Sequence, residues 1–502
     1  MLVVLTDHSK KLQKYSIQVK ASHYVLDSLS ISYSHLVKLQ IVLFYKKCNL
    51  RIADYKHTRR RHNMSDSSNS AINWDKLTEE ATNLLSDYLR VDTINPPGNE
   101  TRAAKWFGKI LDTEGIEYEM YGPTESRQSL VAKLDGDGSR GDGLILLNHT
   151  DVVPFEREHW TKEPMGGEVS NGFIWGRGAI DMKGMGIIEL ITFLLHKRHN
   201  LPLKRDLIFM AIADEEAGSS FGVEYFDREH PELLECAYVI NEGGCGTSEI
   251  LGHDRPTFNI GVSEKGPFWV TLKTIGTPGH GSVPTTDNAA VKLVSALEKI
   301  SNWNRPIIQT PEVVEYFQQL HDHGILEEPP SPEYLEKLAE GNPRLKSLQT
   351  NSISLTTVNA GVKMNVIPAS ASATLDCRLV PGYDREKFMT ELEEIINDPD
   401  VEITREFESS TPPSRMDTEL YEIMVAAAKE AVEDSIVLPS VSTGFTDSRV
   451  FRRRGTPAYG FVPFLLGDQE VGRGHGNDEC VSIENIKLGM QVLHKTVRNI
   501  CG

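Results

Sequence analysis

The sequence predicts an α/β protein with a largely parallel sheet, and two observations support this fold class. Short apolar runs of strand length alternate with amphipathic stretches of helix length. Several of the runs are followed at once by His or acidic residues, and open α/β sheets place their sites just beyond the carboxyl ends of strands. The predicted strands cover residues 130–134, 144–147, 207–213 and 237–240.

Two helices frame these strands. Residues 75–90 carry Leu77, Ala81, Leu84 and Leu85 at the spacing of a helix face, and the turn signal at 95–98 ends the segment. Residues 185–196 form the second helical stretch, between the strands at 144–147 and 207–213. A third helical pattern covers 420–432, near the end of the chain.

The middle of the chain predicts a second domain of strands and helices, inserted at about 262–380. Residues 268–275 read as a strand, Asp287 can cap a helix over 290–300, and 305–350 form an excursion with local helices. Residues 370–379 alternate strictly, with Asp376 and Arg378 on the same polar side.

Composition narrows the class of protein. A chain of 502 residues is expected to form two or more domains, and no apolar run reaches the ~20 residues of a membrane span. The formal net charge of −18 argues against a nucleic-acid partner. Six scattered cysteines without a C-x-x-C motif indicate free thiols in a reducing compartment. We therefore expect a cytoplasmic protein with neither a membrane nor a nucleic acid as partner.

Residues 1–63 differ from the rest of the chain. They carry 12 Lys/Arg and 3 Asp/Glu, so their net charge is +9, whereas that of the remainder is −27. This segment can be a basic targeting arm, a disordered tail or an upstream stretch that is not translated. We expect a working chain that begins at Met64, with 1–73 as an extension that is disordered or not part of the native chain.

Five short motifs each supply a residue that binds divalent metals. Two imidazoles and three carboxylates can hold two Zn²⁺ ions if one carboxylate bridges them, and a spare carboxylate beside such a pair is typical of a hydrolase. The candidate ligands are His149, Asp181, Glu216, Glu242 and His475. Glu215 is the candidate base.

Each of these residues also has an ordinary structural interpretation. A His after a strand is more often structural, and Asp181 in its glycine-rich turn can be a simple cap. The acidic run 214–216 can be a solvated turn, although three unpaired acids there would repel one another. Asp151 lies two residues after His149, close enough to accept a ring N–H and fix the tautomer.

The motif order resembles the co-catalytic di-zinc peptidases and deacylases. This family includes acetylornithine deacetylase, succinyl-diaminopimelate desuccinylase, aminoacylase, carnosinase-type dipeptidases and glutamate carboxypeptidase. The resemblance spans about residues 75–500. The resemblance implies that His149 and Asp181 are metal ligands and that Asp181 bridges the two metals. Glu216 and His475 would complete the shell of one metal, and Glu242 that of the other. Glu215 would be the general base.

The resemblance also implies an α+β, ferredoxin-like lid that forms a homodimer interface. In that family a lid histidine, matched by His280, reaches the partner subunit's site, where it would stabilise an oxyanion. Asn365 and Arg378 match lid residues that hold the substrate carboxylate, although pairing with Asp376 is an alternative role for Arg378. Asn148 replaces a glycine common before the first histidine. The expected domains are the extension 1–73, catalytic parts 74–261 and 381–502, and the lid 262–380.

We therefore expect hydrolysis of the amide bond of an N-acyl amino acid or short peptide, with two Zn²⁺ per subunit and Co²⁺ or Mn²⁺ as possible substitutes. Two alternatives remain. The same fold could act on a carbamoyl or ester bond, or it could be a non-catalytic binding protein; the second predicts a lost ligand or base, yet all six positions are filled.

Overall fold

The computed structural model describes residues 72–502. The predicted extension over 1–73 lies almost entirely outside the described residues, so its three interpretations stay predictions. Within residues 72–502, no helix combines the length and the apolar composition that a membrane crossing requires. The cysteines of this part are free thiols, as predicted: Cys236, Cys245, Cys377, Cys480 and Cys501.

A mixed eight-stranded sheet, in the order β1-β2-β6-β3-β7-β16-β8-β15, carries the candidate site. The central strands β6, β3, β7 and β16 run parallel, whereas β1, β2 and β8 pair antiparallel with their inner neighbours and β15 is parallel to β8. The predicted α/β class is confirmed. The bounds are β1 Tyr118–Tyr121, β2 Ser129–Leu134, β3 Leu144–His149, β6 Leu207–Ile212, β7 Tyr238–Thr247, β8 Thr257–Glu264, β15 Ile436–Ser442 and β16 Ala458–Leu466.

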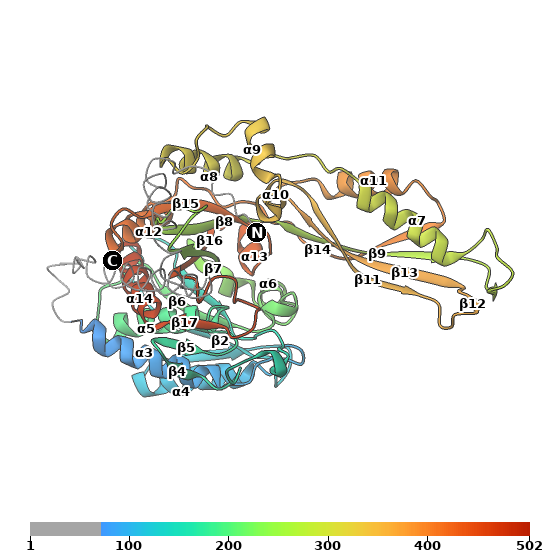
Figure 1. The fold of residues 1–502 in the computed structure, drawn as a ribbon. Coiled ribbons are helices and arrows are strands. Elements are labelled where there is room, and N and C mark those ends of the chain that lie inside the picture. The colour runs from blue at the N-terminus through green and yellow to red at the C-terminus, as the bar shows by residue number, and fades with distance from the viewer. Residues whose placement is uncertain (1–71) are drawn as a thin grey trace, which may run out of the picture. The chain divides into compact units, whose positions relative to one another are not determined.

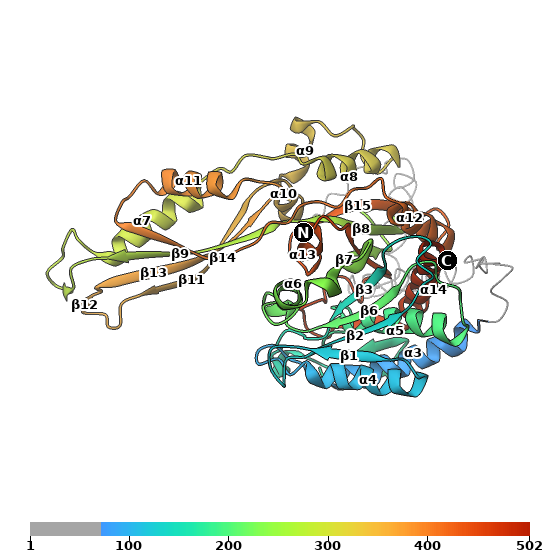
Figure 2. The same cartoon turned by 180° about the vertical axis from the view of Figure 1, so that it is seen from behind.

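Helices cover both faces of this sheet, which explains why its strands are apolar throughout (Figures 1 and 2). In β3, Leu144 and Leu146 belong to one core, while Ile145 and Leu147 belong to the core on the opposite face. The first core includes α3 Trp74–Leu89, α4 Thr101–Glu114, α5 Lys183–Arg198, α12 Glu419–Ala431 and α14 Ile483–Cys501. The second includes α6 Val223–Glu229 and α13 Ser448–Arg453. The helices predicted at 75–90, 185–196 and 420–432 are confirmed.

A smaller antiparallel sheet has the order β11-β13-β9-β14 and carries two helices on one face. The alternation predicted over 370–379 is confirmed, because every second residue of β13 is buried beneath those helices. The bounds are β9 Gly266–Ile275, β11 Ser352–Ala360, β13 Ser370–Leu379, β14 Val401–Glu408, α7 Ala289–Asn302 and α11 Arg385–Ile396. The lid boundary at 380 stays a prediction, and the sheet also includes β14, which follows it.

One local prediction about α7 is wrong. Asn288, not Asp287, caps the helix, because the Asn288 side chain accepts the N–H groups of Ala290 and Val291. Asp287 instead forms an ion pair with Lys292 at 2.6 Å.

The excursion predicted at 305–350 contains three helices that each begin with a proline, α8 Pro311–Asp322, α9 Pro332–Ala339 and α10 Pro343–Gln349. Their apolar side chains form a core with β15 of the main sheet. The remaining short elements are β4 Glu168–Ser170, β5 Phe173–Trp175, β10 Gly279–His280, β12 Val366–Ile367, β17 Cys480–Ser482 and the 3₁₀ turns Arg157–His159, Glu215–Ala217 and Pro231–Leu234.

Candidate metal centre

The carboxyl ends of three neighbouring strands bring the predicted motifs together. His149 is the last residue of β3, and Glu215 and Glu216 lie in the 3₁₀ turn that follows β6. The predicted end of the third strand at residue 240 is wrong, because β7 continues to Thr247 and Glu242 lies within it.

A bulge in β7 explains the position of Glu242. Between the pairs Asn241–Gly460 and Cys245–Val462 the register shifts, so that three residues of β7 lie opposite one residue of β16. The bulge requires glycine. A Cβ on Gly244 would lie 2.3 Å from the carbonyl oxygen of Gly460. The glycines that follow Glu242 therefore let the strand bend and direct the carboxylate out of the ladder.

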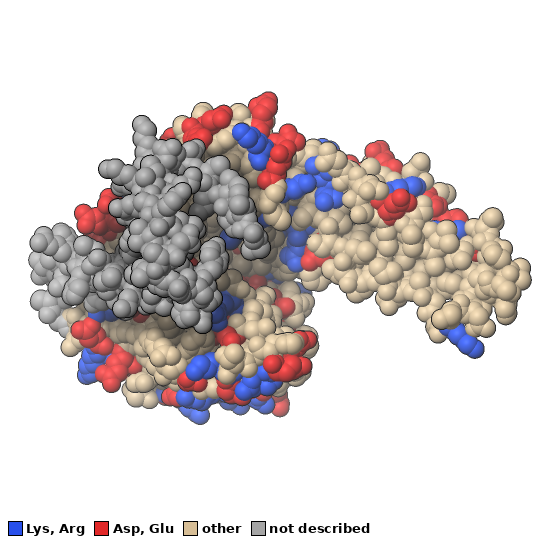
Figure 3. All heavy atoms as spheres, in the orientation of Figure 1, with Lys and Arg blue, Asp and Glu red and all other residues tan. Residues whose placement is uncertain are grey.

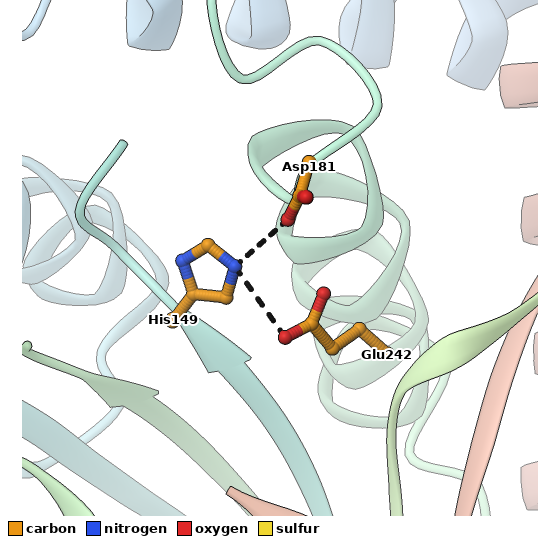
Figure 4. A group of neighbouring side chains, drawn as sticks. All are labelled: His149, Asp181 and Glu242. Carbon is orange, nitrogen blue, oxygen red and sulfur yellow. Dashed lines mark hydrogen bonds and ion pairs between the residues drawn. The ribbon is translucent and has the colours of Figure 1, made fainter. Parts of the chain in front are cut away.

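Asp181 lies between two groups of potential ligands. Its Oδ1 is 3.0 Å from His149 Nε2, and its Oδ2 is 3.2 Å from His475 Nε2. Glu242 Oε1 lies 3.6 Å from His149 Nε2 on the first side (Figure 4), and Glu216 Oε1 lies 3.1 Å from His475 Nε2 on the second. The atoms of each group lie within 4.8 Å of one another. Asp181 thus offers one oxygen to each group, which is the arrangement a bridging carboxylate needs.

The tautomer of His149 is set by its other ring nitrogen. Nδ1 donates to the main-chain oxygen of Asp151 at 3.0 Å, while the Asp151 carboxylate is farther away, at 3.7 Å. Because Nδ1 carries the proton, the lone pair of Nε2 faces Asp181 and Glu242. Asp151 fixes the tautomer, but through its backbone rather than through its side chain.

The side chain of Asp151 has a different task. Its carboxylate accepts the N–H groups of Glu215 and Glu216 at 3.1 and 3.2 Å, and the amide of Asn95 at 2.8 Å. This fully buried carboxylate therefore holds the turn that presents both the candidate base and a candidate ligand.

The acidic run 214–216 divides into residues with separate environments. Asp214 forms an ion pair with Arg127, which also binds the buried Glu100, and accepts the N–H of Phe221 at 2.9 Å. Glu215 has no such cationic partner among the described residues, and burial and then the nearby Glu242 raise its pKa well above the ordinary value. Asp214 is thus structural, whereas Glu215 is a buried carboxylate whose raised pKa favours the protonated form.

A buried ion pair connects the two loops that carry Asp181 and His475. Glu479 accepts the N–H groups of Gly178, Ile180 and Asp181, and its carboxylate lies 2.7 Å from Arg177 Nη1. Arg177 in turn donates to the main-chain oxygens of the 475–476 turn, at 3.2 and 3.0 Å. These contacts join segments about 300 residues apart and hold both loops in register.

The electrostatics of the cluster fit a pair of divalent cations. Within residues 72–502, no Lys or Arg forms an ion pair with Asp181, Glu216 or Glu242. Burial and the neighbouring Asp181 raise the pKa of Glu242 to about 8, and hydrogen bonds that His475 donates to Asp181 and Glu216 raise the pKa of His475 to about 10. Carboxylates and imidazoles crowded without a compensating cation are a donor set for metals such as Zn²⁺.

The family model "Peptidase family M20/M25/M40" matches residues 145–499, a span that contains every residue of the cluster. The chain belongs to this family. It is accordingly a metal-dependent hydrolase of the M20 class.

Known relatives match most of the length of this protein. It is 28% identical over 387 residues to aminoacylase-1B of Rattus norvegicus, with 76% of this chain and 86% of the relative covered. It is 27% identical over 453 residues to an N-fatty-acyl-amino acid synthase/hydrolase of Xenopus tropicalis, with 85% of this chain and 86% of the relative covered.

Solved structures share the M20 fold. A metallo-carboxypeptidase of Sulfolobus solfataricus matches with a TM-score of 0.67 at 20% identity, covering 84% of this chain and 99% of that one. Human carnosine dipeptidase 1 matches with a TM-score of 0.62 at 16% identity, covering 85% and 97%.

Three other residues predicted to act on the substrate, His280, Asn365 and Arg378, lie outside the cluster of candidate metal ligands. Arg378 donates through Nε and Nη2 to Asp376 at 2.6 and 2.9 Å, so the alternative structural pairing is present. His280 and Asn365 are exposed and lie beside each other, where β10 pairs with β12 and Gly281 N–H donates to the Asn365 carbonyl at 2.8 Å.

Sequence reasoning missed the residues that hold the cluster in place. Asn95, Arg127, Arg177 and Glu479 are polar residues whose partners lie 27 to 302 positions away. The one available signal was position. Asn95 stands in the turn that ends α3, while Arg177 and Glu479 lie within a few residues of predicted ligands.

Proposed function

We propose that this protein hydrolyses the amide bond of N-acyl amino acids or short peptides with two Zn²⁺ ions per subunit. The observation that carries the proposal is the position of Asp181 between two ligand groups. His149 and Glu242 would complete one metal's shell, and Glu216 and His475 the other's. Co²⁺ and Mn²⁺ are candidate substitutes, since carboxylate-rich sites discriminate weakly among these ions.

The metals, when bound, supply Lewis acidity that polarises the amide carbonyl and lowers the pKa of water. The chain supplies the proton transfers. The Glu215 carboxylate accepts a proton from the attacking water and passes it to the nitrogen of the departing amine, so the amine leaves neutral. Its raised pKa suits both steps, because a base that works near neutrality must also release its proton.

Asp151 is a positioning residue in this proposal. By accepting both N–H groups of the 215–216 turn, it fixes the direction in which Glu215 and Glu216 leave the backbone. A general base contributes only if it lies within hydrogen-bond reach of the proton, so a rigid turn is part of its activity.

A complete substrate site is proposed to need two copies of the chain. His280 and Asn365 lie together near β12, whereas Arg378 lies near the opposite end of β13. At ~3.3 Å per residue, Asn365 and Arg378 are about 25 Å apart, and Figure 1 shows β12 at the far end of the small sheet. One chain cannot place all three side chains on one substrate, so a second copy would supply His280 and Asn365.

The free edge of the small sheet supports such a homodimer. Strand β11 ends the sheet, and its residues include no charged side chain. Leu355 and Val358 on β11 are half exposed, as are Val291 and Val294 on α7, and few charged side chains lie over β9, β11 and β13 in Figure 3. An unprotected apolar edge strand is a site for pairing with another chain.

Sedimentation measurements test the dimer. Val358→Asp should give a monomer, because a charge at the edge opposes strand pairing. Val169→Asp is the matched control, since Val169 is similarly exposed but lies on β4. If both variants sediment like the wild type, β11 is not the interface.

A substrate panel tests the reaction. Metal-reconstituted protein is offered N-acetyl amino acids, dipeptides, N-carbamoyl amino acids and esters, and amide hydrolysis is expected. Glu215→Gln should retain both metals but lose activity by about 10²–10⁴-fold, the contribution of a general base. Glu229→Gln, an exposed acid on α6, is the control. Normal turnover by Glu215→Gln would disprove the role of Glu215, and exclusive cleavage of carbamoyl or ester bonds would disprove the substrate class.

Cytoplasmic location stays a prediction.

A further inference from the structure

Three aromatic side chains form a partly exposed cluster beside the metal centre. Trp269 on β9 and Phe407 on β14 are opposite each other in the small sheet, with ring centroids 5.2 Å apart. Phe445, in the loop before α13, lies 5.8 Å from the Phe407 ring and 6.5 Å from the Trp269 ring. We call these three residues the aromatic cluster.

The aromatic cluster lies on the face of the small sheet opposite its helices. Along β9, Phe268 and Val270 point into the core beneath α7 and α11, so Trp269 between them points to the other face. Trp269 remains 37% exposed, whereas Phe268 is 1% exposed. Trp269 therefore keeps part of its ring accessible on this face, next to the half-buried rings of Phe407 and Phe445.

Two rings of the cluster pack against Arg378. The guanidinium lies 4.9 Å from the Phe445 ring centroid and 5.7 Å from that of Trp269. Asp376 holds Nε and Nη2, and its Oδ1 also accepts the indole N–H of Trp269 at 2.9 Å. Asp376 therefore orients both side chains, and the two hydrogen bonds leave the Nη1 edge of Arg378 for a substrate carboxylate.

The cluster is also continuous with the turn that carries Glu215. The Arg449 guanidinium lies 5.0 Å from the Phe445 ring and donates to the Gly218 carbonyl at 3.1 Å, one turn beyond Glu215. On the other side, a Cβ on Gly218 would lie 4.0 Å from Cζ of Phe407. A substrate held at Arg378 and attacked near Glu215 would therefore lie along these rings.

We propose that Trp269, Phe407 and Phe445 form the subsite for an apolar side chain on the amino acid that carries the substrate carboxylate. This inference rests on the proposed function. The side chain and the carboxylate leave the same Cα, so a carboxylate at Arg378 places the side chain against the surrounding rings. The acyl group lies beyond the scissile amide, farther from Arg378.

The test compares two series of substrates on the metal-loaded enzyme. In the first, the acyl group is acetyl and the amino acid is Gly, Ala, Leu or Phe. In the second, the amino acid is Gly and the acyl chain lengthens. The value of kcat/KM should rise by about fourfold per buried methylene in the first series and remain flat in the second. A rise confined to the second series would overturn the proposal.

Variants connect the preference to the rings. Trp269→Leu should lower the ratio of kcat/KM for N-acetylphenylalanine to that for N-acetylglycine by about two- to tenfold, the contribution of one aromatic contact. Trp303→Leu should leave the ratio unchanged, because Trp303 stacks on Phe388 on the helix-covered side of the same sheet. Equal ratios in Trp269→Leu and the wild type would refute the subsite.

A binding measurement separates this inference from the proposed function. Calorimetry of N-acetylphenylalanine and N-acetylglycine with metal-loaded Glu215→Gln does not depend on turnover. If no amide is hydrolysed by the wild type but N-acetylphenylalanine binds more tightly, the function fails and the subsite stands. If both ligands bind equally, the subsite fails even where hydrolysis occurs.

Discussion

The buried ion pair between Arg177 and Glu479 offers a sharp test of how the metal centre is held together. Glu479→Gln keeps the shape of the side chain and removes only its charge and one acceptor oxygen. Oε1 accepts the N–H groups of Ile180 and Asp181 at 2.8 and 3.1 Å, and Oε2 accepts those of Gly178 and Arg177 at 3.0 and 2.7 Å. Whichever oxygen becomes an amide NH₂, two donors lose their acceptor.

The expected cost follows from burial. Glu479 is 0% exposed and Arg177 is 2% exposed, so water cannot replace the lost contacts. Removing one partner of a buried ion pair leaves an uncompensated charge and destabilises a protein by about 3–5 kcal/mol. We therefore expect Glu479→Gln to lower the free energy of unfolding by about that amount. Metal affinity should fall as well, because the loop that presents Asp181 loses its anchor.

Urea unfolding and metal titration of the same preparations measure both effects. Glu470→Gln is the matched control, because Glu470 is also buried and accepts the N–H groups of Gly467 and Ser482, yet forms no ion pair with an arginine within residues 72–502. Its loss should be smaller and its metal affinity unchanged. Equal destabilisation of the two variants, with equal metal affinity, would show that the Arg177 pair has no special role.

Three further outcomes are expected. Metal affinity measured by competition titration should rise from pH 6 to pH 8. The pKa of Glu242 is about 8, so below that pH the carboxylate carries a proton that must leave before metal binds. A metal affinity that is flat over this pH range would contradict the prediction. Chelation should lower the thermal midpoint and metal re-addition restore it, since a ligand at about 100 times its Kd stabilises by about 2.7 kcal/mol; an unchanged midpoint would rule out metal-linked stability. Gly244→Ala should abolish metal binding by displacing Glu242, because its Cβ would lie 2.3 Å from the Gly460 carbonyl oxygen, whereas Gly138→Ala, with open space around it, should bind metal normally.

The strands and helices around the site could be predicted because their signals are local. The run 144–147 is apolar at every position, which is the pattern of a strand covered on both faces, and the two cores on either side of β3 supply that cover. His149 then follows by position, since parallel strands end at a common edge. The bulge at Glu242 was missed because it depends on how β16 pairs with β7, which no local pattern of residues specifies.

The roles within the acidic run 214–216 could not be assigned from the sequence alone. Asp214, Glu215 and Glu216 are consecutive acids with the same titration chemistry, and only their partners distinguish them. Asp214 forms an ion pair with Arg127, which lies just before β2. Glu216 lies beside His475, which comes from the C-terminal part of the chain. Both partners are charged or polar residues that usually lie on surfaces, so neither stands out by composition.

Arginine partners distinguish two structural carboxylates of this protein, Asp214 and Glu479, from its candidate ligand carboxylates. Asp214 and Glu479 are buried, and each forms an ion pair with an arginine. Asp181, Glu216 and Glu242 have only imidazoles beside them within residues 72–502. Burying a carboxylate without a cation is costly, so the first set is neutralised by the chain and the second depends on ions from solution. Placing an arginine next to the second set should therefore expel metal without unfolding the protein, while removing an arginine from the first set should destabilise the fold as well as weaken metal binding.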